Sequence, residues 1–283
     1  MSMPNSRYTL AFQGFEMVLE VAELQKLLPQ EEIIPASLEK LSHEIERDKI
    51  IKHPIIVDRN SMIVLDGNHR VKAMKELGCS YIPICAVDYR DPLIEVKCWY
   101  RTIQGTRYES LAETFRDFRD VDSDLEDTSK IVNSNNALVI TAKEQALISD
   151  PYSNLPELYE ALKEIENELR DLGFKIDYVS EEAASKGVLE GRVLAYIATP
   201  PLTKEIVIGV VHSGKRFPCK TSRHILYARP MGVDFPLTFL KNRSLIEANR
   251  EFYLWISKKQ IEQIPRRTVF EGRIYDERIF LFH

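Results

Sequence analysis

The amino-acid sequence predicts an α+β protein with two domains. Its length of 283 residues suits two domains of ordinary size. Strand and helix patterns alternate over roughly the first hundred residues. A second mixed series of strands and helices follows an acidic, polar stretch at 117–136. We therefore expect a first domain at 1–120, a linker at 121–136 and a mixed α/β second domain at 137–283.

Short apolar segments separated by turn residues define the elements expected in the first domain. Apolar residues at helical spacing predict a helix over Ser37–Asp48, and Pro35 precedes it as a helix-start signal. His53–Asp58 and Ser61–Leu65 are typical of a strand hairpin. The other expected elements are a strand within Phe15–Leu28, a helix at Asn68–Leu77 that ends at Gly78, and strands at Tyr81–Val87 and Ile94–Tyr100.

The second domain is expected to combine one long helix with several strands. Leucine and isoleucine residues at helical spacing predict an amphipathic helix over Leu155–Leu172, which Gly173 ends. The other expected elements are strands at Ala137–Thr141, Arg192–Thr199 and Glu205–His212, an irregular basic loop at Ser213–Pro230, a helix at Ser244–Gln263 and a hairpin within Phe270–Phe282.

Composition and charge favour an ordinary globular protein of the cytoplasm. The chain is 44% hydrophobic and 29% charged, and its formal net charge of −5 argues against nucleic acid as the main partner. The four cysteines form no CxxC pair, which argues against a zinc knuckle and suits a reducing compartment. We find neither a signal-peptide pattern nor an apolar run of membrane-spanning length, so no membrane partner is expected.

The most informative motif is the turn Asp66-Gly67-Asn68-His69-Arg70, between an apolar strand and an amphipathic helix. A helix start exposes unpaired N–H groups and carries the positive end of the helix dipole, so it favours an anion. The glycine lets a ligand approach the backbone, and the histidine and arginine add donors. These features predict a phosphate site. A simple helix-capping turn with two solvated basic side chains explains the same five residues equally well.

Two further groups of residues are candidates for chemistry. Glu31 and Glu32 follow a proline break, where a carboxylate can act as a general base or can merely favour the dipole of the next helix. Lys220-Thr221-Ser222-Arg223-His224 combines charge and hydrogen-bonding groups that can bind a carboxylate or phosphate, although a solvated basic loop has the same composition.

Trp99 is a candidate of a different kind. It follows a strand-like segment, where a tryptophan most often packs in a core or an interface. The wall of a substrate pocket is the alternative interpretation of this position.

The segment LDGNHRVKAMKELGCSYIPI, at Leu65–Ile84, resembles the ParB/sulfiredoxin superfamily in the order of strand, turn, helix and strand. A catalytic cysteine is missing from the turn, which argues against a sulfiredoxin, and an acidic mixed second half argues against a DNA-segregation protein. FPCKTSRHILYARP, at Phe217–Pro230, resembles the C-terminal signature of free-serine kinases. Pro29-x-Glu31 matches the position of that family's catalytic glutamate. The chain differs from many members at Asn68, where they have histidine, and at Cys219, where they have proline.

This resemblance implies a kinase that phosphorylates the hydroxyl group of free L-serine, with ATP or ADP as donor and a slight preference for ATP. Glu31 would be the catalytic base, with Glu32 as the fallback. The resemblance further implies an active site in a cleft between the two domains. The residues implied for binding are Asp66, Gly67, Asn68, His69 and Arg70 for the nucleotide phosphates, and Trp99, Lys220, Thr221, Ser222, Arg223 and His224 for the substrate.

Mg²⁺ is the cofactor implied by the resemblance, held mainly by the phosphates, with Asp66 as a possible ligand. Two alternatives remain open. A ParB-like nucleotide-sensing DNA-binding regulator would explain the Asp66–Arg70 turn but not the basic loop. A kinase for another small hydroxyl compound would use the same motifs, because pocket shape decides between small alcohols.

Overall fold

The computed structural model describes residues 7–105, 111, 113–121, 136–143 and 145–283. Contacts divide the chain into two compact units, each of which is described by itself. The first unit contains Met1–Glu95, Lys204–Cys219 and His224–His283, and the second contains Val96–Thr203 and Lys220–Arg223. The chain therefore leaves the first unit and returns to it.

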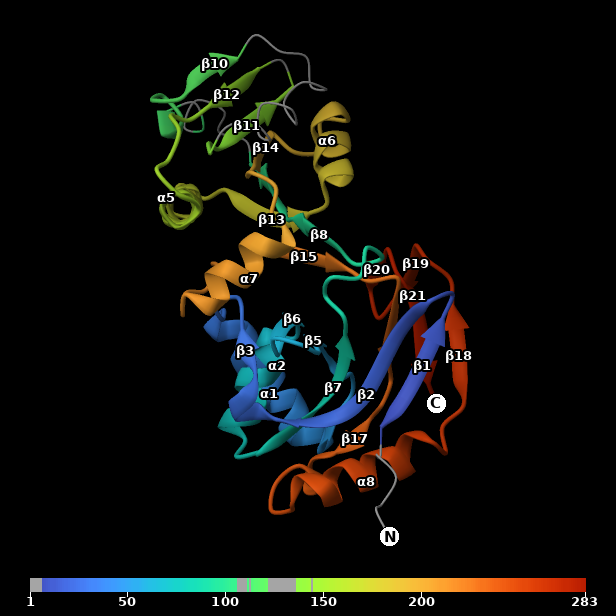
Figure 1. Ribbon diagram of the computed structural model, residues 1–283. Coiled ribbons are helices and arrows are strands. Elements are labelled where there is room, and N and C mark those ends of the chain that lie inside the picture. Colours follow the sequence, from blue (N-terminus) through green and yellow to red (C-terminus); the bar gives the residue numbers. More distant parts are fainter. Residues whose placement is uncertain (1–6, 106–110, 112, 122–135, 144) are drawn as a thin grey trace. The chain divides into compact units, whose positions relative to one another are not determined.

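A six-stranded mixed sheet organises the first unit (Figure 1). Its order is β1 (Tyr8–Phe12), β2 (Phe15–Glu23), β7 (Tyr81–Val87), β5 (Ile55–Asp58), β6 (Ile63–Asp66) and β3 (Leu28–Pro29). Neighbouring strands are antiparallel except for the parallel pairs β5/β7 and β3/β6. The helices of this unit are α1 (Pro35–Asp48), α2 (Asn68–Glu76), α7 (Lys204–His212) and α8 (Leu245–Ile256).

The C-terminal segments of the first unit add three smaller sheets. In the largest, β21 (Arg278–Phe282) lies between β16 (Ala228–Met231), with which it is parallel, and β18 (Ile261–Ile264), with which it is antiparallel. The others pair β17 (Phe235–Pro236) with β4 (Ile50–Ile51) and β19 (Thr268–Phe270) with β20 (Arg273–Tyr275).

One hydrophobic core joins the two ends of the chain within the first unit. Leu19 of β2 and Met74 of α2 belong to the same buried cluster as Phe235, Phe252 and Phe282. In Figure 1 the blue N-terminal strands and the red C-terminal elements accordingly occupy the same unit. Burial of these apolar side chains is the main stabilising contribution to such a unit.

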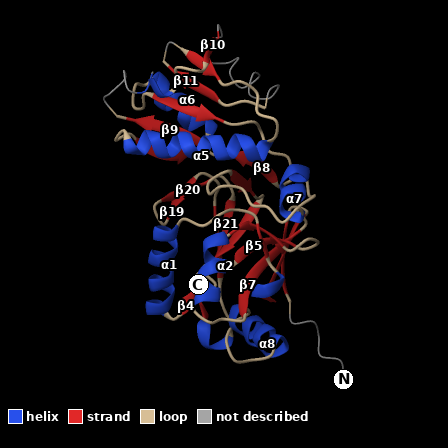
Figure 2. Cartoon of the chain, turned by 90° about the vertical axis from the view of Figure 1, so that its left-hand side faces the viewer, coloured by secondary structure: helices blue, strands red, loops and turns tan. Residues whose placement is uncertain are grey.

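The second unit contains a six-stranded sheet in which all neighbouring strands are antiparallel. Its order is β10 (Arg119–Val121), β12 (Ala146–Ile148), β11 (Val139–Ala142), β14 (Ala195–Ala198), β9 (Tyr100–Gln104) and β13 (Lys175–Val179). Helix α5 (Leu155–Asp171) contacts β13, and α6 (Glu181–Leu189) contacts β9 and β14; Figure 2 shows both helices. The short strands β8 (Glu95–Cys98) and β15 (Ser222–Ile225) pair with each other.

The structure confirms the mixed α/β architecture and most elements of the first hundred residues. The predicted hairpin is β5 and β6, the predicted helices are α1 and α2, and the predicted strand after them is β7. The long helix of the second half is α5. The expected strand at Ile94–Tyr100 contains the whole of β8, and its last residue is the first of β9.

Four expectations in the second half were wrong. Residues 205–212 form helix α7 rather than a strand, because Val207 and Val211 lie one turn apart and both are buried. The supposedly irregular 213–230 contains β15 and β16. The helix expected to reach Gln263 ends at Ile256 and is followed by β18. In the expected last hairpin, β20 pairs with β19, whereas β21 pairs with β16 and β18.

The compact units also differ from the predicted division at 120 and 137. Residues 224–283 belong with the N-terminal residues because their aromatic side chains complete the same core. Residues 122–135, most of the predicted linker, lie outside the described residues, and Val121 is the end of β10.

Candidate active site

The turn predicted to bind phosphate joins strand β6 to helix α2. Gly67 is the N-cap of the helix and has a φ of 107°. A Cβ atom at this position would lie 2.4 Å from Cγ2 of Ile55, so a side chain would be both strained and too close to strand β5. The sequence therefore needs glycine here to turn the chain from strand to helix. The N–H groups at the start of α2 face away from the helix body and suit an anion.

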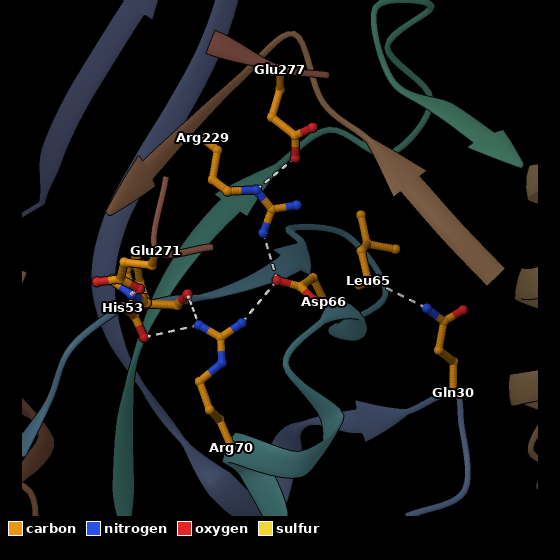
Figure 3. A network of polar contacts seen from close by, with 9 residues as sticks. Gln30, His53, Leu65, Asp66, Arg70, Arg229, Glu271 and Glu277 are labelled. Carbon is orange, nitrogen blue, oxygen red and sulfur yellow. Dashed lines mark hydrogen bonds and ion pairs between the residues drawn. The ribbon is translucent and has the colours of Figure 1, made fainter. Parts of the chain in front are cut away.

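Arg70 connects this turn to the backbone that precedes strand β5 (Figure 3). Its Nη2 donates to Oδ2 of Asp66 at 2.8 Å, and its Nη1 donates to the carbonyl oxygens of His53 at 3.1 Å and Pro54 at 2.7 Å. Burial lowers the pKa of Arg70, although the Asp66 carboxylate opposes this shift. Both terminal nitrogens are thus bound to the protein, so in this arrangement Arg70 holds the turn in place.

Arg229 contacts the same carboxylate oxygen from strand β16. Its Nη1 donates to Oδ2 of Asp66 at 2.5 Å, and its Nε donates to Oε1 of Glu277 at 2.7 Å. Arg229 is 6% exposed and Glu277 is 4% exposed. Burial opposes the charged form of Arg229, but the carboxylates of Glu277 and Asp66 outweigh it and raise the pKa. Two guanidinium groups therefore hold one oxygen of Asp66.

Asn68 and His69 hold the loop that carries the candidate base. Oδ1 of Asn68 accepts a hydrogen bond from the backbone N–H of Gln30 at 3.0 Å. Nε2 of His69 accepts one from the backbone N–H of Ile34 at 3.1 Å, which places the proton of a neutral ring on Nδ1. The first two residues of α2 thus fix both ends of the segment that contains Glu31.

Phe217 holds the same loop from its other side. The N–H of Phe217 donates to the carbonyl oxygen of Gln30 at 2.8 Å, and the N–H of Glu32 donates to the carbonyl oxygen of Phe217 at 2.8 Å. These two bonds form a parallel bridge between Glu31 and Phe217. The structure therefore brings the candidate base, the Asp66–Arg70 turn and the start of the basic loop together within the first unit.

His224 is buried beneath the Gln30 loop rather than displayed on a basic surface. Its Nε2 lies 2.7 Å from the hydroxyl of Tyr89, and its Nδ1 lies 3.4 Å from Nε2 of Gln30. Burial lowers the pKa of His224 to about 4, so the ring is neutral at pH 7. Nε2 of Gln30 also donates to the carbonyl oxygen of Leu65 at 3.1 Å. His224 therefore supports the loop before Glu31.

The remaining candidates form a second group around Trp99, within the second unit. Nζ of Lys220 and Cζ of Arg223 lie 5.6 and 5.1 Å from the centre of the indole ring, within the range of cation–π interactions. The N–H of Trp99 donates to the carbonyl oxygen of Thr221 at 3.3 Å. Thr221 and Ser222 are buried.

A buried ion pair supports the backbone of Trp99. Nη1 of Arg101 donates to the carbonyl oxygen of Trp99, and its Nε donates to Oε1 of Glu166, both at 2.8 Å. Burial opposes ionisation of Glu166, but Arg101 outweighs it and lowers the pKa. The backbone of the cation–π group is thus held by a buried ion pair of the second unit.

Sequence reasoning missed the residues that support the predicted ones. Four residues contact the predicted site residues but were not themselves predicted. Tyr89 and Glu277 lie outside the motifs, whereas Gln30 and Arg229 lie within motifs but were given no role. The one available signal was the position of Arg229, a charged residue in the apolar segment ILYARPM that precedes a glycine. Nothing comparable marks Gln30 or Tyr89.

Two findings concern the described part of the chain as a whole. No group of three or more His, Cys, Asp or Glu side chains there has the geometry of a metal site. The helices described include none that combines the length and apolar character needed to cross a membrane.

Comparison with known proteins gave no matching family model. A ParB-like protein of Sulfolobus acidocaldarius is 30% identical over 211 residues, which are 74% of this chain and 91% of the relative. An ATP-dependent L-serine kinase of Staphylothermus marinus is 29% identical over 238 residues, covering 77% of this chain and 90% of the relative. The ADP-dependent L-serine kinase of Thermococcus kodakarensis is 23% identical over 221 residues, covering 76% and 90%.

Among solved structures, free serine kinase in complex with AMP has a similar fold. The TM-score is 0.64 at 21% sequence identity, and the match covers 78% of this chain and 93% of that chain.

Proposed function

Because the chain belongs to the ParB/sulfiredoxin-like family that includes the free L-serine kinases, we propose that it is such a kinase. It transfers the terminal phosphoryl group of a nucleoside phosphate to the hydroxyl of free L-serine. The products are O-phospho-L-serine and the shortened nucleotide. It is thus a phosphotransferase with an alcohol group as acceptor.

The observation that carries this proposal is the double attachment of the Glu31 loop. Asn68 binds the backbone N–H of Gln30, and Phe217 binds the backbone of Gln30 and of Glu32 on either side of Glu31. A carboxylate held on a fixed loop beside a phosphate-binding helix start suits a general base. In our mechanism Glu31 takes the hydroxyl proton of serine as the oxygen attacks the terminal phosphorus. The bond from phosphorus to the bridging oxygen breaks, and the nucleotide leaves with that oxygen.

Phosphoryl transfer depends mainly on positioning and on stabilisation of charge. We assign the nucleotide phosphates to the Asp66–Arg70 turn, where the N–H groups at the start of α2 are the principal donors. Arg70 and Asp66 act in this scheme as anchors of the turn, because their side chains bind each other. The bond that Nε2 of His69 accepts from Ile34 leaves the ring proton on Nδ1.

Mg²⁺ would neutralise phosphate charge during the transfer. It would be held mainly by the phosphates, as Mg²⁺ commonly is. Asp66 fits poorly as a direct ligand through Oδ2, because two guanidinium groups already bind that atom.

The group around Trp99 is our candidate for recognition of the serine carboxylate. Lys220 and Arg223 supply positive charge there, and Trp99 supplies a rigid wall. His224, given its buried position, supports the site rather than touching the substrate. The cleft between two domains, in which closure would exclude water, stays a prediction from the family resemblance.

ATP is the donor that we favour over ADP. The ATP-dependent relative from Staphylothermus marinus is 29% identical to this chain, whereas the ADP-dependent relative from Thermococcus kodakarensis is 23% identical. Both donors share the phosphate chemistry, so the choice depends on parts of the site other than the Asp66–Arg70 turn.

Phosphorus NMR tests the function and the donor in one experiment. The protein is incubated with Mg²⁺, L-serine and either ATP or ADP, with a parallel sample that lacks serine. We expect a phosphomonoester signal of O-phosphoserine and matching loss of the terminal phosphate signal of ATP. Nucleotide consumption that does not depend on serine would contradict the proposal. Replacing serine by L-threonine, L-homoserine or glycerol tests a kinase for another small hydroxyl compound.

The ParB-like relative supports a second candidate, a nucleotide-sensing DNA-binding regulator. A gel-shift assay near physiological salt separates the two functions. Tight, salt-sensitive DNA binding without serine phosphorylation would favour the regulator. The net charge of −5 favours the kinase.

A further inference from the structure

The ion pair between Arg229 and Glu277 is buried, and it joins the end of the Phe217–Pro230 motif to a residue outside every motif. Nε of Arg229 donates to Oε1 of Glu277 at 2.7 Å, with exposed fractions of 6% and 4%. Burying two charges costs desolvation free energy, and well-packed apolar residues often stabilise a fold as well or better. Stability alone is therefore a weak explanation for this pair, and its third partner points to another role.

That third partner is the carboxylate at the start of the phosphate turn. Nη1 of Arg229 and Nη2 of Arg70 donate to the same Oδ2 atom of Asp66, at 2.5 and 2.8 Å. Arg70 also donates to the carbonyl oxygens of His53 and Pro54, just before strand β5. Figure 3 shows the resulting chain of contacts from Glu277 through Arg229 and Asp66 to Arg70.

Asp66 directly precedes Gly67, whose φ of 107° sets the direction in which helix α2 begins. A displacement of the Asp66 carboxylate would rotate this turn and redirect the N–H groups at the helix start. The turn is packed closely against strand β5, because a Cβ atom on Gly67 would lie only 2.4 Å from Ile55. The position of the phosphate donors thus depends on what holds Asp66.

We propose that Arg229, braced by Glu277, is a positioning residue that holds Asp66 and so sets the nucleotide-phosphate site. This inference rests on the proposed function, since it assigns the phosphates to the turn after β6. Arg229 itself touches neither substrate nor nucleotide in this scheme. Arg229 lies on strand β16, and Glu277 directly precedes strand β21. The C-terminal part of the chain thus supports a phosphate turn that lies at residues 66–70.

The first experiment measures nucleotide binding to full-length Arg229→Met, Arg229→Lys and Glu277→Gln proteins by calorimetry with Mg²⁺ and ATP or ADP, without serine. We expect Arg229→Met to raise the nucleotide Kd about tenfold, the loss typical of removing a supporting contact. Arg229→Lys keeps the positive charge but cannot bind both carboxylates with separate nitrogens. It should therefore bind nucleotide more tightly than Arg229→Met and more weakly than the wild type. In turnover assays the KM of the nucleotide should rise while the KM of serine stays within twofold.

Ile256→Ala is the matched control for loss of stability. Ile256 is fully buried in the core of the same unit but is no part of the ion network. This variant should lower the Tm while leaving the nucleotide Kd unchanged at temperatures well below its transition. If Arg229→Met does not fold, Arg229→Lys and Glu277→Gln decide the question.

A double-mutant cycle between Asp66→Asn and Arg229→Met tests the route of the effect. If Arg229 acts through Asp66, the two losses of nucleotide affinity will be clearly less than additive. Additive losses, or a folded Arg229→Met protein with a Kd within twofold of wild type, would overturn the inference. A wild-type protein that binds nucleotide but does not phosphorylate serine would instead contradict the proposed function alone.

Discussion

The side-chain oxygen of Asn68 accepts a hydrogen bond from the backbone N–H of Gln30 at 3.0 Å, which joins the start of helix α2 to the loop of the candidate base. Asn68 is 8% exposed, so water cannot readily replace this bond. The position is one at which the chain differs from many free-serine kinases. Its structural requirement is an acceptor directed at the Gln30 N–H, which asparagine meets.

Replacing Asn68 by alanine should therefore affect both stability and turnover. The Gln30 N–H loses its acceptor while staying buried, at a cost of about 1–3 kcal/mol in the free energy of unfolding. The loop that carries Glu31 loses one attachment, so kcat should fall about 10- to 100-fold. Chemical denaturation and serine-dependent nucleotide consumption measure the two effects. Lys72→Ala, at an exposed position on the same helix, should change neither by a comparable amount.

Glu31→Gln should remove the base while leaving the phosphate site intact. We expect kcat to fall by about 10²- to 10⁴-fold with a nucleotide Kd close to wild type. Steady-state kinetics and calorimetry give the two quantities. Glu32→Gln is the comparison, because its backbone N–H rather than its side chain binds Phe217. Full activity in Glu31→Gln together with loss in Glu32→Gln would transfer the role to the neighbouring carboxylate.

Arg223→Ala tests the binding of serine. Loss of a charge-assisted bond to the carboxylate should raise the KM of serine about 10- to 100-fold and leave that of the nucleotide nearly unchanged. Arg216, which is exposed and precedes Phe217, provides a control arginine from the same part of the sequence. An unchanged serine KM in Arg223→Ala would remove this residue from the site.

The buried His224 predicts a pH dependence of stability. Burial lowers its pKa from 6.5 to about 4, so the unfolded chain binds a proton at a pH where the folded protein does not. The contribution of the neutral His224 to stability is therefore fully present above about pH 6.5 and is lost as the pH decreases toward 4. Between pH 7 and pH 5 this residue should account for about 2 kcal/mol of the free energy of unfolding. Urea denaturation of the wild type and of His224→Gln at pH 7 and pH 5 measures this loss of unfolding free energy. If the variant loses as much as the wild type between the two pH values, His224 is not its cause.

Two glycines allow backbone strain to be separated from steric overlap. Gly67 and Gly78 both have positive φ, 107° and 71°, but only at Gly67 would a Cβ atom meet other atoms within 4 Å. Gly78→Ala should cost about 1–2 kcal/mol from the left-handed conformation alone. Gly67→Ala should cost about 1–3 kcal/mol more, because its methyl group overlaps Ile55. Equal losses in thermal denaturation would show that strand β5 moves aside without cost.

Local patterns in the sequence were sufficient for the parts of the fold that depend on local chemistry. The strand, glycine turn and helix around Gly67 were predicted correctly, as was the long helix α5, because glycine conformation and leucine spacing act over a few residues. Helix α7 was mistaken for a strand because its apolar run is too short for the period to be distinguished.

The supporting contacts of the candidate site could not be predicted in the same way. Arg229 reaches Asp66 across 163 positions of sequence, and Tyr89 reaches His224 across 135. Nothing local in the chain records such a pairing. Arg70 and His224 were predicted to contact an anion because arginine and histidine are common anion ligands. In the structure both side chains instead bind other groups of the protein.

The shared core of the first unit has a consequence for how the protein is made. Leu19 on strand β2 packs in the same cluster as Phe235 and Phe282, so the N-terminal strands cannot complete the burial of their apolar faces until the ribosome has released the last of these aromatic residues. At roughly 5–20 residues per second, those strands wait many seconds in an aggregation-prone state. The nascent chain should consequently recruit chaperones during synthesis, and a prematurely terminated product should be degraded rather than accumulate as a stable N-terminal fragment.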